Sequence, residues 1–126
     1  MVEKDPIDTT IIEGLIAEIG PESVARVLDA MASDAERLLI GLQRALEAED
    51  QKAFSLFAHS LKSNSLTVGA VKVGALFHEL EAMAGNGQLV AMQSSVQHAT
   101  AEYQKLIGFI VTVPDSDPQI RLSSVG

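Results

Sequence analysis

Residues 21–49, PESVARVLDAMASDAERLLIGLQRALEAE, decide the fold class of this chain. Their apolar side chains recur every three or four positions over about eight turns, which places one apolar stripe along an α-helix. Gly20 and Pro21 precede the stripe, and proline is favoured at the first position of a helix. A helix of this length must bury its stripe against other helices, so the segment predicts a helical bundle. The stripe consists of Val24, Val27, Leu28, Met31, Ala35, Leu38, Leu39, Leu42 and Leu46.

The same spacing continues on both sides of this segment. A short helix is predicted over residues 9–19, with Asp8 or Thr9 as its N-cap. Three more helices are predicted: one at about 51–67, one between the turn at Gly69 and the stop signal at residues 85–87, and one at about 89–111.

Four long helices with short connections predict an all-α, antiparallel up-down four-helix bundle. The additional short N-terminal helix is expected to pack across one end. Residues 1–113 are assigned to this single domain. Residues 114–126 lack a hydrophobic period and contain two prolines and three serines, so a flexible C-terminal tail or linker is predicted there.

Composition excludes several classes of protein. The 126 residues contain no cysteine, which removes disulfides, thiolate metal sites and thiol nucleophiles. Residues 1–6 have neither a basic nor an apolar signal-peptide region, and no apolar run is long enough for a transmembrane helix. We therefore expect a cytoplasmic protein that does not bind membranes.

The net charge of −8 argues against a nucleic-acid partner, because phosphate contacts need clustered lysine and arginine. The charge is unevenly distributed: residues 1–50 hold 12 acids and 4 bases, whereas residues 51–126 hold 5 of each. No acid occurs between Gln51 and His78, although Lys52, Lys62 and Lys72 do. An acidic chain therefore carries one locally cationic segment.

His59 lies in this segment, on the helix predicted at 51–67. Successive residues are turned by about 100° around the helix axis. The residues within about 40° of the direction opposite His59 are apolar, so this side is predicted to face the core. That side holds Phe54, Phe57, Leu61 and Val68, and the side of His59 holds Lys52, Ser55, Leu56, Lys62, Ser63 and Leu66. His59 is therefore expected to be exposed in the middle of a helix.

Two interpretations of His59 remain open on the pattern alone: an ordinary surface histidine, or an exposed nucleophile or ligand. An imidazole in water is nucleophilic near neutral pH, and Lys62, one turn away, could neutralise an anion attached to it. Ser55 and Ser63 are small enough for close approach by another protein, and Leu56 and Leu66 could anchor that protein. These features suit a phosphoryl acceptor that is docked by a protein.

Other candidate residues receive simpler interpretations. His78 and His98 are predicted to be ordinary surface residues. A metal-binding bundle would need paired Glu-x-x-His ligands that project inward, which this sequence lacks, so no metal site is predicted. A bundle that only binds other proteins, with an incidental histidine, remains the alternative function.

The segment 58–70, AHSLKSNSLTVGA, resembles the signature of histidine phosphotransfer (HPt) domains, in which His-x-x-Lys-Gly is followed by a glycine six residues later. The resemblance continues through Leu76, Leu80 and Glu81 on the next helix. It implies a four-helix bundle that carries one phosphorylatable histidine on an exposed helix face. Members of this family pass a phosphoryl group between aspartates of response-regulator receiver domains, in phosphorelays fed by sensor kinases.

The resemblance also implies roles for individual residues. His59 would be the phosphoacceptor, Lys62 the cation near the phosphoryl oxygens, and Glu81 a hydrogen-bond partner toward His59. Ser55, Leu56, Ser63 and Leu66 are the candidate partner-binding residues. Ser63 departs from the family pattern, which usually has glycine after the lysine to leave room for the receiver.

The resemblance further implies receiver domains and a sensor or hybrid histidine kinase as partners. The chain is expected to bind no cofactor, with Mg²⁺ carried by the receiver, and to act as a monomer. The sequence contains no ATP-binding motif, so a phosphoryl carrier is predicted rather than an enzyme. The alternative is an interaction module that binds a receiver or kinase without phosphotransfer.

Overall fold

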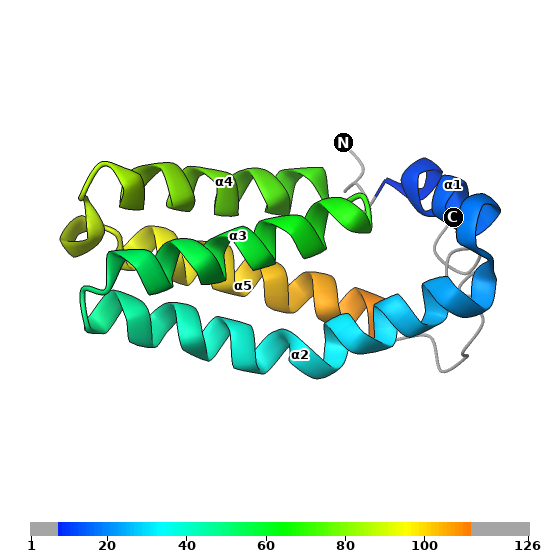
Figure 1. Cartoon of the computed structure of the whole chain (residues 1–126), viewed down its shortest axis with the longest axis horizontal. Coiled ribbons are helices and arrows are strands. Elements are labelled where there is room, and N and C mark those ends of the chain that lie inside the picture. The colour runs from blue at the N-terminus through cyan, green and yellow to red at the C-terminus, as the bar shows by residue number, and fades with distance from the viewer. Residues whose placement is uncertain (1–7, 112–126) are drawn as a thin grey trace.

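The computed structural model describes residues 8–111, which form five α-helices and one short 3₁₀ helix. Figure 1 shows α2 to α5 side by side along the long axis, alternating in direction, with α1 at one end. The expected all-α bundle is confirmed over these residues. The tail predicted at 114–126 lies outside the described residues. The helices are α1 (Thr9–Ile19), α2 (Pro21–Glu47), α3 (Gln51–Thr67), α4 (Val71–Gly85), η1 (Leu89–Ala91) and α5 (Gln93–Val111).

The start of the last helix differs from the prediction. A continuous helix was expected from about Leu89, but Leu89–Ala91 form the separate turn η1 and α5 begins at Gln93. Leu89 and Met92 are both buried, because the tighter turn directs these two side chains into the end of the core. Hydrophobic spacing alone does not distinguish this turn from a continuous α-helix.

The three turns between the long helices share one C-terminal capping pattern. In each turn, a residue with positive φ follows the helix, and its N–H and the next N–H donate back to carbonyl groups of the last turn, as in a Schellman motif. After α2, for example, the N–H of Asp50 donates to the carbonyl of Ala45 at 2.9 Å. The residues with positive φ are Glu49 (54°), Gly69 (79°) and Gly87 (72°).

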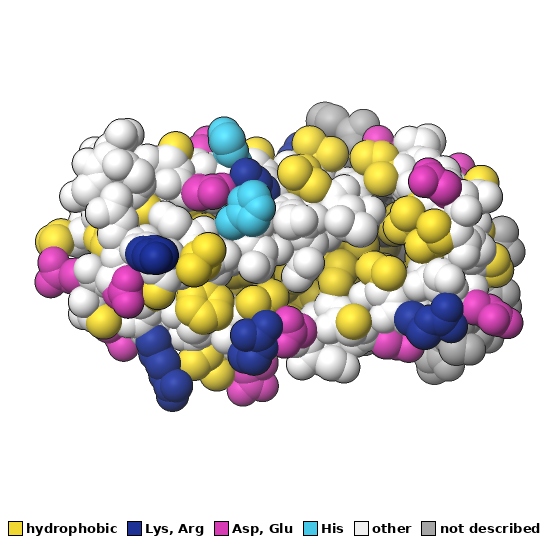
Figure 2. All heavy atoms as spheres, in the orientation of Figure 1, with side chains coloured by type: hydrophobic (Ala, Val, Ile, Leu, Met, Phe, Trp, Pro, Cys, Tyr) yellow, Lys and Arg dark blue, Asp and Glu magenta, His cyan; other side chains and the backbone are white. Residues whose placement is uncertain are grey.

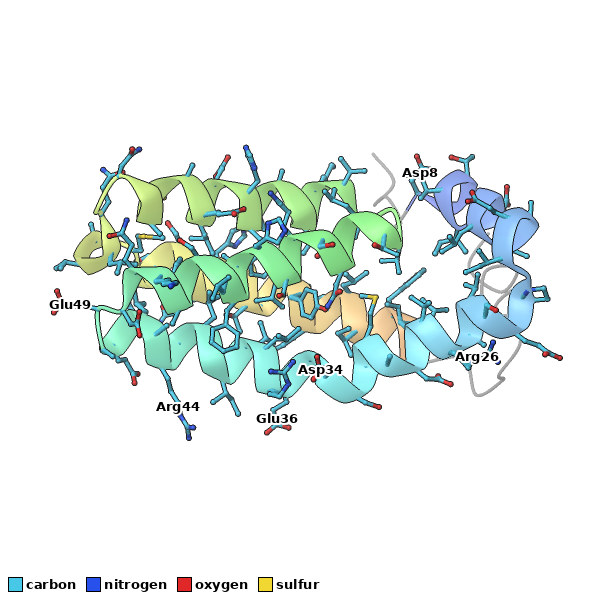
Figure 3. All side chains as sticks on the ribbon, in the orientation of Figure 1. Asp8, Arg26, Asp34, Glu36, Arg44 and Glu49 are labelled. Carbon is cyan, nitrogen blue, oxygen red and sulfur yellow. The ribbon has the colours of Figure 1, made fainter. Side chains whose placement is uncertain are left out.

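Gly69 also ties α1 to the end of α3. The N–H of Asp8 donates to the Gly69 carbonyl at 2.7 Å, and a Cβ at position 69 would lie 2.6 Å from the Asp8 carbonyl oxygen. Asp8, labelled at the start of α1 in Figure 3, caps this helix by accepting from the N–H of Thr10 at 3.0 Å. Ile12 and Ile16 of α1 then reach the core of the bundle.

The core stripe of α3 is rotated by about 30° from the one predicted. Phe54, Leu61 and Val68 are fully buried as expected, whereas Phe57 is only partly buried, which corrects the prediction for that residue. Its ring lies over Gly41 of α2, in the space that a side chain there would occupy. The stripe is completed by two small residues, Ala58 and Ser65, both with no exposed surface.

Small residues explain the rotation, because they let α3 and α4 approach closely. These two helices form the most extensive helix–helix contact of the described chain. Gly74 of α4 lies under Leu66 of α3, where a Cβ would come within 2.6 Å of a Leu66 methyl group. One flank of α3, on the side of Lys62, is therefore covered by α4. None of the described helices combines the length and the hydropathy that a membrane span requires.

Candidate functional site: an exposed histidine on α3

His59 lies in the middle of α3 with 60% of its side chain exposed. Phe54 and Leu61, on the opposite side of the helix, have no exposed surface. The helix is held in this phase by its buried stripe and by Asp50, whose carboxylate caps the first turn by accepting from the N–H of Ala53 at 3.0 Å. The predicted exposure of His59 is confirmed.

Glu81 on α4 links His59 and Lys62. One carboxylate oxygen, Oε2, lies 3.3 Å from Nδ1 of His59, and the other, Oε1, lies 3.0 Å from Nζ of Lys62. The side chains of Lys62 and Glu81 are 20% and 30% exposed, and Oε1 itself is shielded from solvent. The structure thus brings together the three residues to which sequence analysis gave chemical roles.

The charges of this triad are coupled. Burial raises the pKa of the Glu81 carboxyl group, but the ammonium of Lys62 and then the imidazole of His59 outweigh burial and hold the pKa below the ordinary value of 4.5. Glu81 is therefore ionised at neutral pH. Its negative charge faces the ammonium of Lys62 on one side and the imidazole of His59 on the other.

The pairing of Glu81 with Lys62 is a feature that sequence analysis missed, since it assigned Glu81 to His59 alone. The available signal was the absence of acids on α3. With no acid on α3, a counterion for Lys62 had to come from another helix, and Glu81 of α4 supplies it at 3.0 Å.

The predicted partner-binding residues surround this triad on the surface. Leu56 and Leu66 are 62% and 44% exposed, Ser63 is exposed, and Ser55 is half-buried. Figure 2 shows histidine, basic and acidic side chains gathered over the boundary of α3 and α4, with hydrophobic side chains on either side of them. Exposed leucine side chains beside a charged cluster suit contact with another macromolecule.

Two open grooves among residues 8–111 lie away from this triad. An open groove of about 610 Å³ between α2 and α3 is lined by Arg37, Arg44 and Phe57 among others, and one of about 580 Å³ lies between α2 and α5. Neither groove includes His59, Lys62 or Glu81. His59 is 60% exposed, which suits a protein partner better than a small substrate enclosed in a pocket.

The other histidines show no comparable environment. His78 on α4 and His98 on α5 are exposed, and no ion pair is found for either within residues 8–111. Over the same residues, no three histidine or carboxylate side chains are grouped so that they could hold a metal ion. A metal titration is the direct test of the rival metal-binding interpretation.

These observations define a class of protein: an all-α bundle that presents one histidine, with a lysine and a carboxylate beside it, in the middle of an exposed helix. Comparison with protein-family models matches residues 26–109 to the Hpt domain. The chain belongs to the Hpt domain family. It is accordingly a histidine phosphotransfer protein of two-component signalling, a family that works with receiver domains and histidine kinases in phosphorelays.

A solved structure agrees with this assignment. The crystal structure of histidine-containing phosphotransfer protein B (HptB) from Pseudomonas aeruginosa PAO1 superposes with a TM-score of 0.78 at 26% sequence identity. The alignment covers 96% of this chain and 98% of that one. A comparison with curated proteins gave no significant match.

Proposed function

We propose that this chain accepts a phosphoryl group from a receiver aspartate on Nε2 of His59 and passes it to the aspartate of another receiver. The observation that carries the proposal is the contact of Nδ1 with Glu81 on a side chain that is 60% exposed. A carboxylate beside Nδ1 favours the tautomer with its proton on Nδ1. The lone pair is then on Nε2, the nitrogen left for an incoming group.

The transfer step balances without a further reactant. The Nε2–P bond forms while the P–O bond to the receiver aspartate breaks, and the electron pair of that bond leaves with the aspartate carboxylate. The Nδ1 proton stays on the imidazole, next to Glu81. Onward transfer reverses these changes with a second receiver. Because the transition state of phosphoryl transfer is loose, the step depends on alignment and on charge stabilisation.

Lys62 supplies the charge stabilisation from this chain. It lies one turn beyond His59 on the same side of α3, and charge-assisted contacts to phosphoryl oxygens are among the stronger polar interactions. We expect Mg²⁺ to be carried by the receiver and no cofactor to be bound by this chain. Leu56 and Leu66 would anchor the receiver, and Ser55 and Ser63 would let it approach closely.

In this proposal the chain is a phosphoryl carrier rather than an enzyme, because half of the reacting centre belongs to the receiver. It acts in the cytoplasm, where receivers and kinase domains are available. Incubation with ATP alone should give no phosphorylated product, whereas a histidine kinase together with its receiver should load the chain.

The test is a transfer screen with radiolabelled, phosphorylated receiver domains and Mg²⁺. A cognate receiver should place one acid-labile, base-stable phosphate on the chain, as expected of phosphoimidazole. His59→Gln should abolish labelling with little change in thermal stability, because exposed side chains contribute little to folding. His78→Gln and His98→Gln are matched controls and should label normally.

Label that persists in His59→Gln would move the acceptor to another histidine. A receiver that binds the chain without labelling it would favour the alternative, an interaction module without phosphotransfer.

A further inference from the structure

Lys62 already has a charge partner before any phosphoryl group arrives. Its ammonium lies 3.0 Å from Oε1 of Glu81. No acid occurs on α3, and Glu81 is the one acidic residue that the described structure pairs with either His59 or Lys62. A phosphoryl group on His59 must therefore share Lys62 with a carboxylate.

This sharing raises the free energy of the phosphorylated state. A dianionic phosphoryl group on Nε2 adds two negative charges beside the charge of Glu81, against the single positive charge of Lys62. Water weakens this repulsion only in part, since the Glu81 side chain is 30% exposed and its Oε1 is shielded from solvent.

We propose that Glu81 lowers the stability of phosphorylated His59 by competing with the phosphoryl group for Lys62, and so favours onward transfer. This inference rests on the function proposed above and adds a positioning role for Glu81 through Lys62. In this proposal, the charge at position 81 sets how readily phosphorylated His59 gives up its phosphoryl group.

Glu81 has a second contact that acts in the opposite direction. Through Oε2, 3.3 Å from Nδ1, it would stabilise a protonated phosphoimidazole and so favour the loaded state. The contact with Lys62 is shorter, at 3.0 Å, and Lys62 is less exposed than His59, at 20% against 60%. The interaction with Lys62 is therefore the stronger one. The two roles predict opposite signs for Glu81→Gln.

The first experiment needs no receiver. The full chain, carrying His78→Gln and His98→Gln so that one histidine remains, is loaded with phosphoramidate. In this reaction the donor P–N bond breaks, the Nε2–P bond forms and ammonia leaves. The pKa of the phosphoryl group is then measured by ³¹P NMR in the chain that retains Glu81, in the Glu81→Gln variant, and in the Glu79→Gln variant as a matched control. Glu79 is exposed on the same helix and faces a groove toward α5, away from the triad.

Removal of the Glu81 charge should favour the dianion. We expect Glu81→Gln to lower the pKa of the phosphoryl group by about half a unit, which is about a threefold change in the ratio of dianion to monoanion. Glu79→Gln should leave the titration unchanged. An unchanged or raised pKa in Glu81→Gln would overturn the proposal. Thermal unfolding of each variant verifies that the bundle is intact.

The second experiment measures the transfer equilibrium with a receiver that labels the wild-type chain. Glu81→Gln should raise the ratio of phosphorylated to free His59 by about threefold at a fixed level of phosphorylated receiver. In a Lys62→Gln background the same substitution should have a smaller effect, because the contested cation is gone. A lower ratio in Glu81→Gln would show that the contact with Nδ1 dominates, and the proposal would fail.

The two experiments separate the two hypotheses. If no receiver labels the chain but the phosphoryl pKa falls as expected, the transfer function is wrong and the competition for Lys62 stands. If receivers label His59 but neither the pKa nor the equilibrium depends on Glu81, the transfer function stands and the competition is wrong.

Discussion

His59 and Lys62 lie one turn apart on α3 but differ in exposure, at 60% and 20% of their side chains. The difference arises because α4 covers only the flank that carries Lys62. The imidazole is left open to an approaching protein, while the lysine side chain is largely covered and its ammonium is held by Glu81 at 3.0 Å. A mobile nucleophile would lose alignment, and a mobile cation would lose part of its interaction with the phosphoryl oxygens.

Replacing Lys62 by alanine tests the role of this cation. Charge-assisted contacts contribute about 1.5–3 kcal/mol, and partial solvent exposure places Lys62 at the lower end of that range. We therefore expect transfer to slow by about tenfold, since about 1.4 kcal/mol corresponds to one decade. Single-turnover transfer measured against receiver concentration should show the loss in the chemical step rather than in binding.

Ser63→Gly is the companion variant, because it changes access to the site and leaves its charges unaltered. It should ease approach of the receiver while lowering helix stability by up to about 1 kcal/mol. If Lys62→Ala transfers at the wild-type rate, Lys62 has no part in the reaction and the site reduces to His59.

Glu81 gives the molecule a defined pH dependence. Its pKa in the folded state lies below the ordinary value of 4.5, so its ion pair stabilises the fold above that value and is lost as the pH falls through the lowered pKa. The stability difference between wild type and Glu81→Gln should be largest near neutral pH and shrink as the pH falls through the lowered pKa. Because the carboxyl group is partly exposed, we expect at most about 1 kcal/mol.

Urea unfolding at several pH values measures this difference. A difference that grows on acidification would contradict the assignment of Glu81 as an ionised partner of Lys62.

Among the elements, α3 shows which buried residues a sequence pattern can predict and which it cannot. The large residues Phe54, Leu61 and Val68 were sufficient to predict which side is buried and that His59 is exposed. They could not reveal that Ala58 and Ser65 are buried too, because small residues leave no hydrophobic signal. Close packing of α4 against these residues is what rotates the stripe and leaves Phe57 at the seam with α2.

The same reasoning separates the predictable part of the site from the rest. His59 and Lys62 share a helix, so their spacing could be derived from the chain alone. The contact between Lys62 and Glu81 crosses two helices, and it depends on the distance that Ser65 and Gly74 permit. Contacts of this kind require the packed structure.

The turn after α2 offers a direct test of the shared capping pattern. Glu49 occupies the left-handed position with φ 54°, where the turns after α3 and α4 have glycine. Figure 3 shows Glu49 at the tip of this turn. Glu49→Gly removes the strain of a side chain in that conformation, offset in part by the greater freedom of glycine in the unfolded chain. We expect a gain of about 0.5 kcal/mol in the free energy of unfolding, measured in urea at unchanged slope.

Two variants control for charge and for position. Glu47→Gly removes the same charge from the last helical residue of α2 and should destabilise by up to about 1 kcal/mol. Gly69→Ala should destabilise by more, because it combines a left-handed conformation with a clash against Asp8. A loss of stability in Glu49→Gly similar to that in Glu47→Gly would show that the turn carries no strain.

At the scale of the molecule, the large exposed apolar side chains of residues 8–111 are distributed over five elements and are not concentrated on one. They lie on α1, α2, α3, α4 and η1, at Ile11, Ile19, Ile40, Leu56, Leu66, Val71 and Val90. A stable homodimer needs a contiguous surface of about 800 Å² per partner. We therefore expect a monomer, and light scattering should give the chain mass of 13.4 kDa. A mass of twice that value would contradict the prediction and require the accessibility of His59 to be tested in the dimer.

The ion pair between Lys62 and Glu81 also has a consequence in time. If it weakens the hold on the phosphoryl group, the loaded protein is emptied soon after a receiver arrives, and its level of loading follows the present input. A relative with an uncharged residue at this position would stay loaded longer and average its input over a longer interval. One carboxylate on α4 would then set how long the relay retains a past signal, and in this chain that time is short.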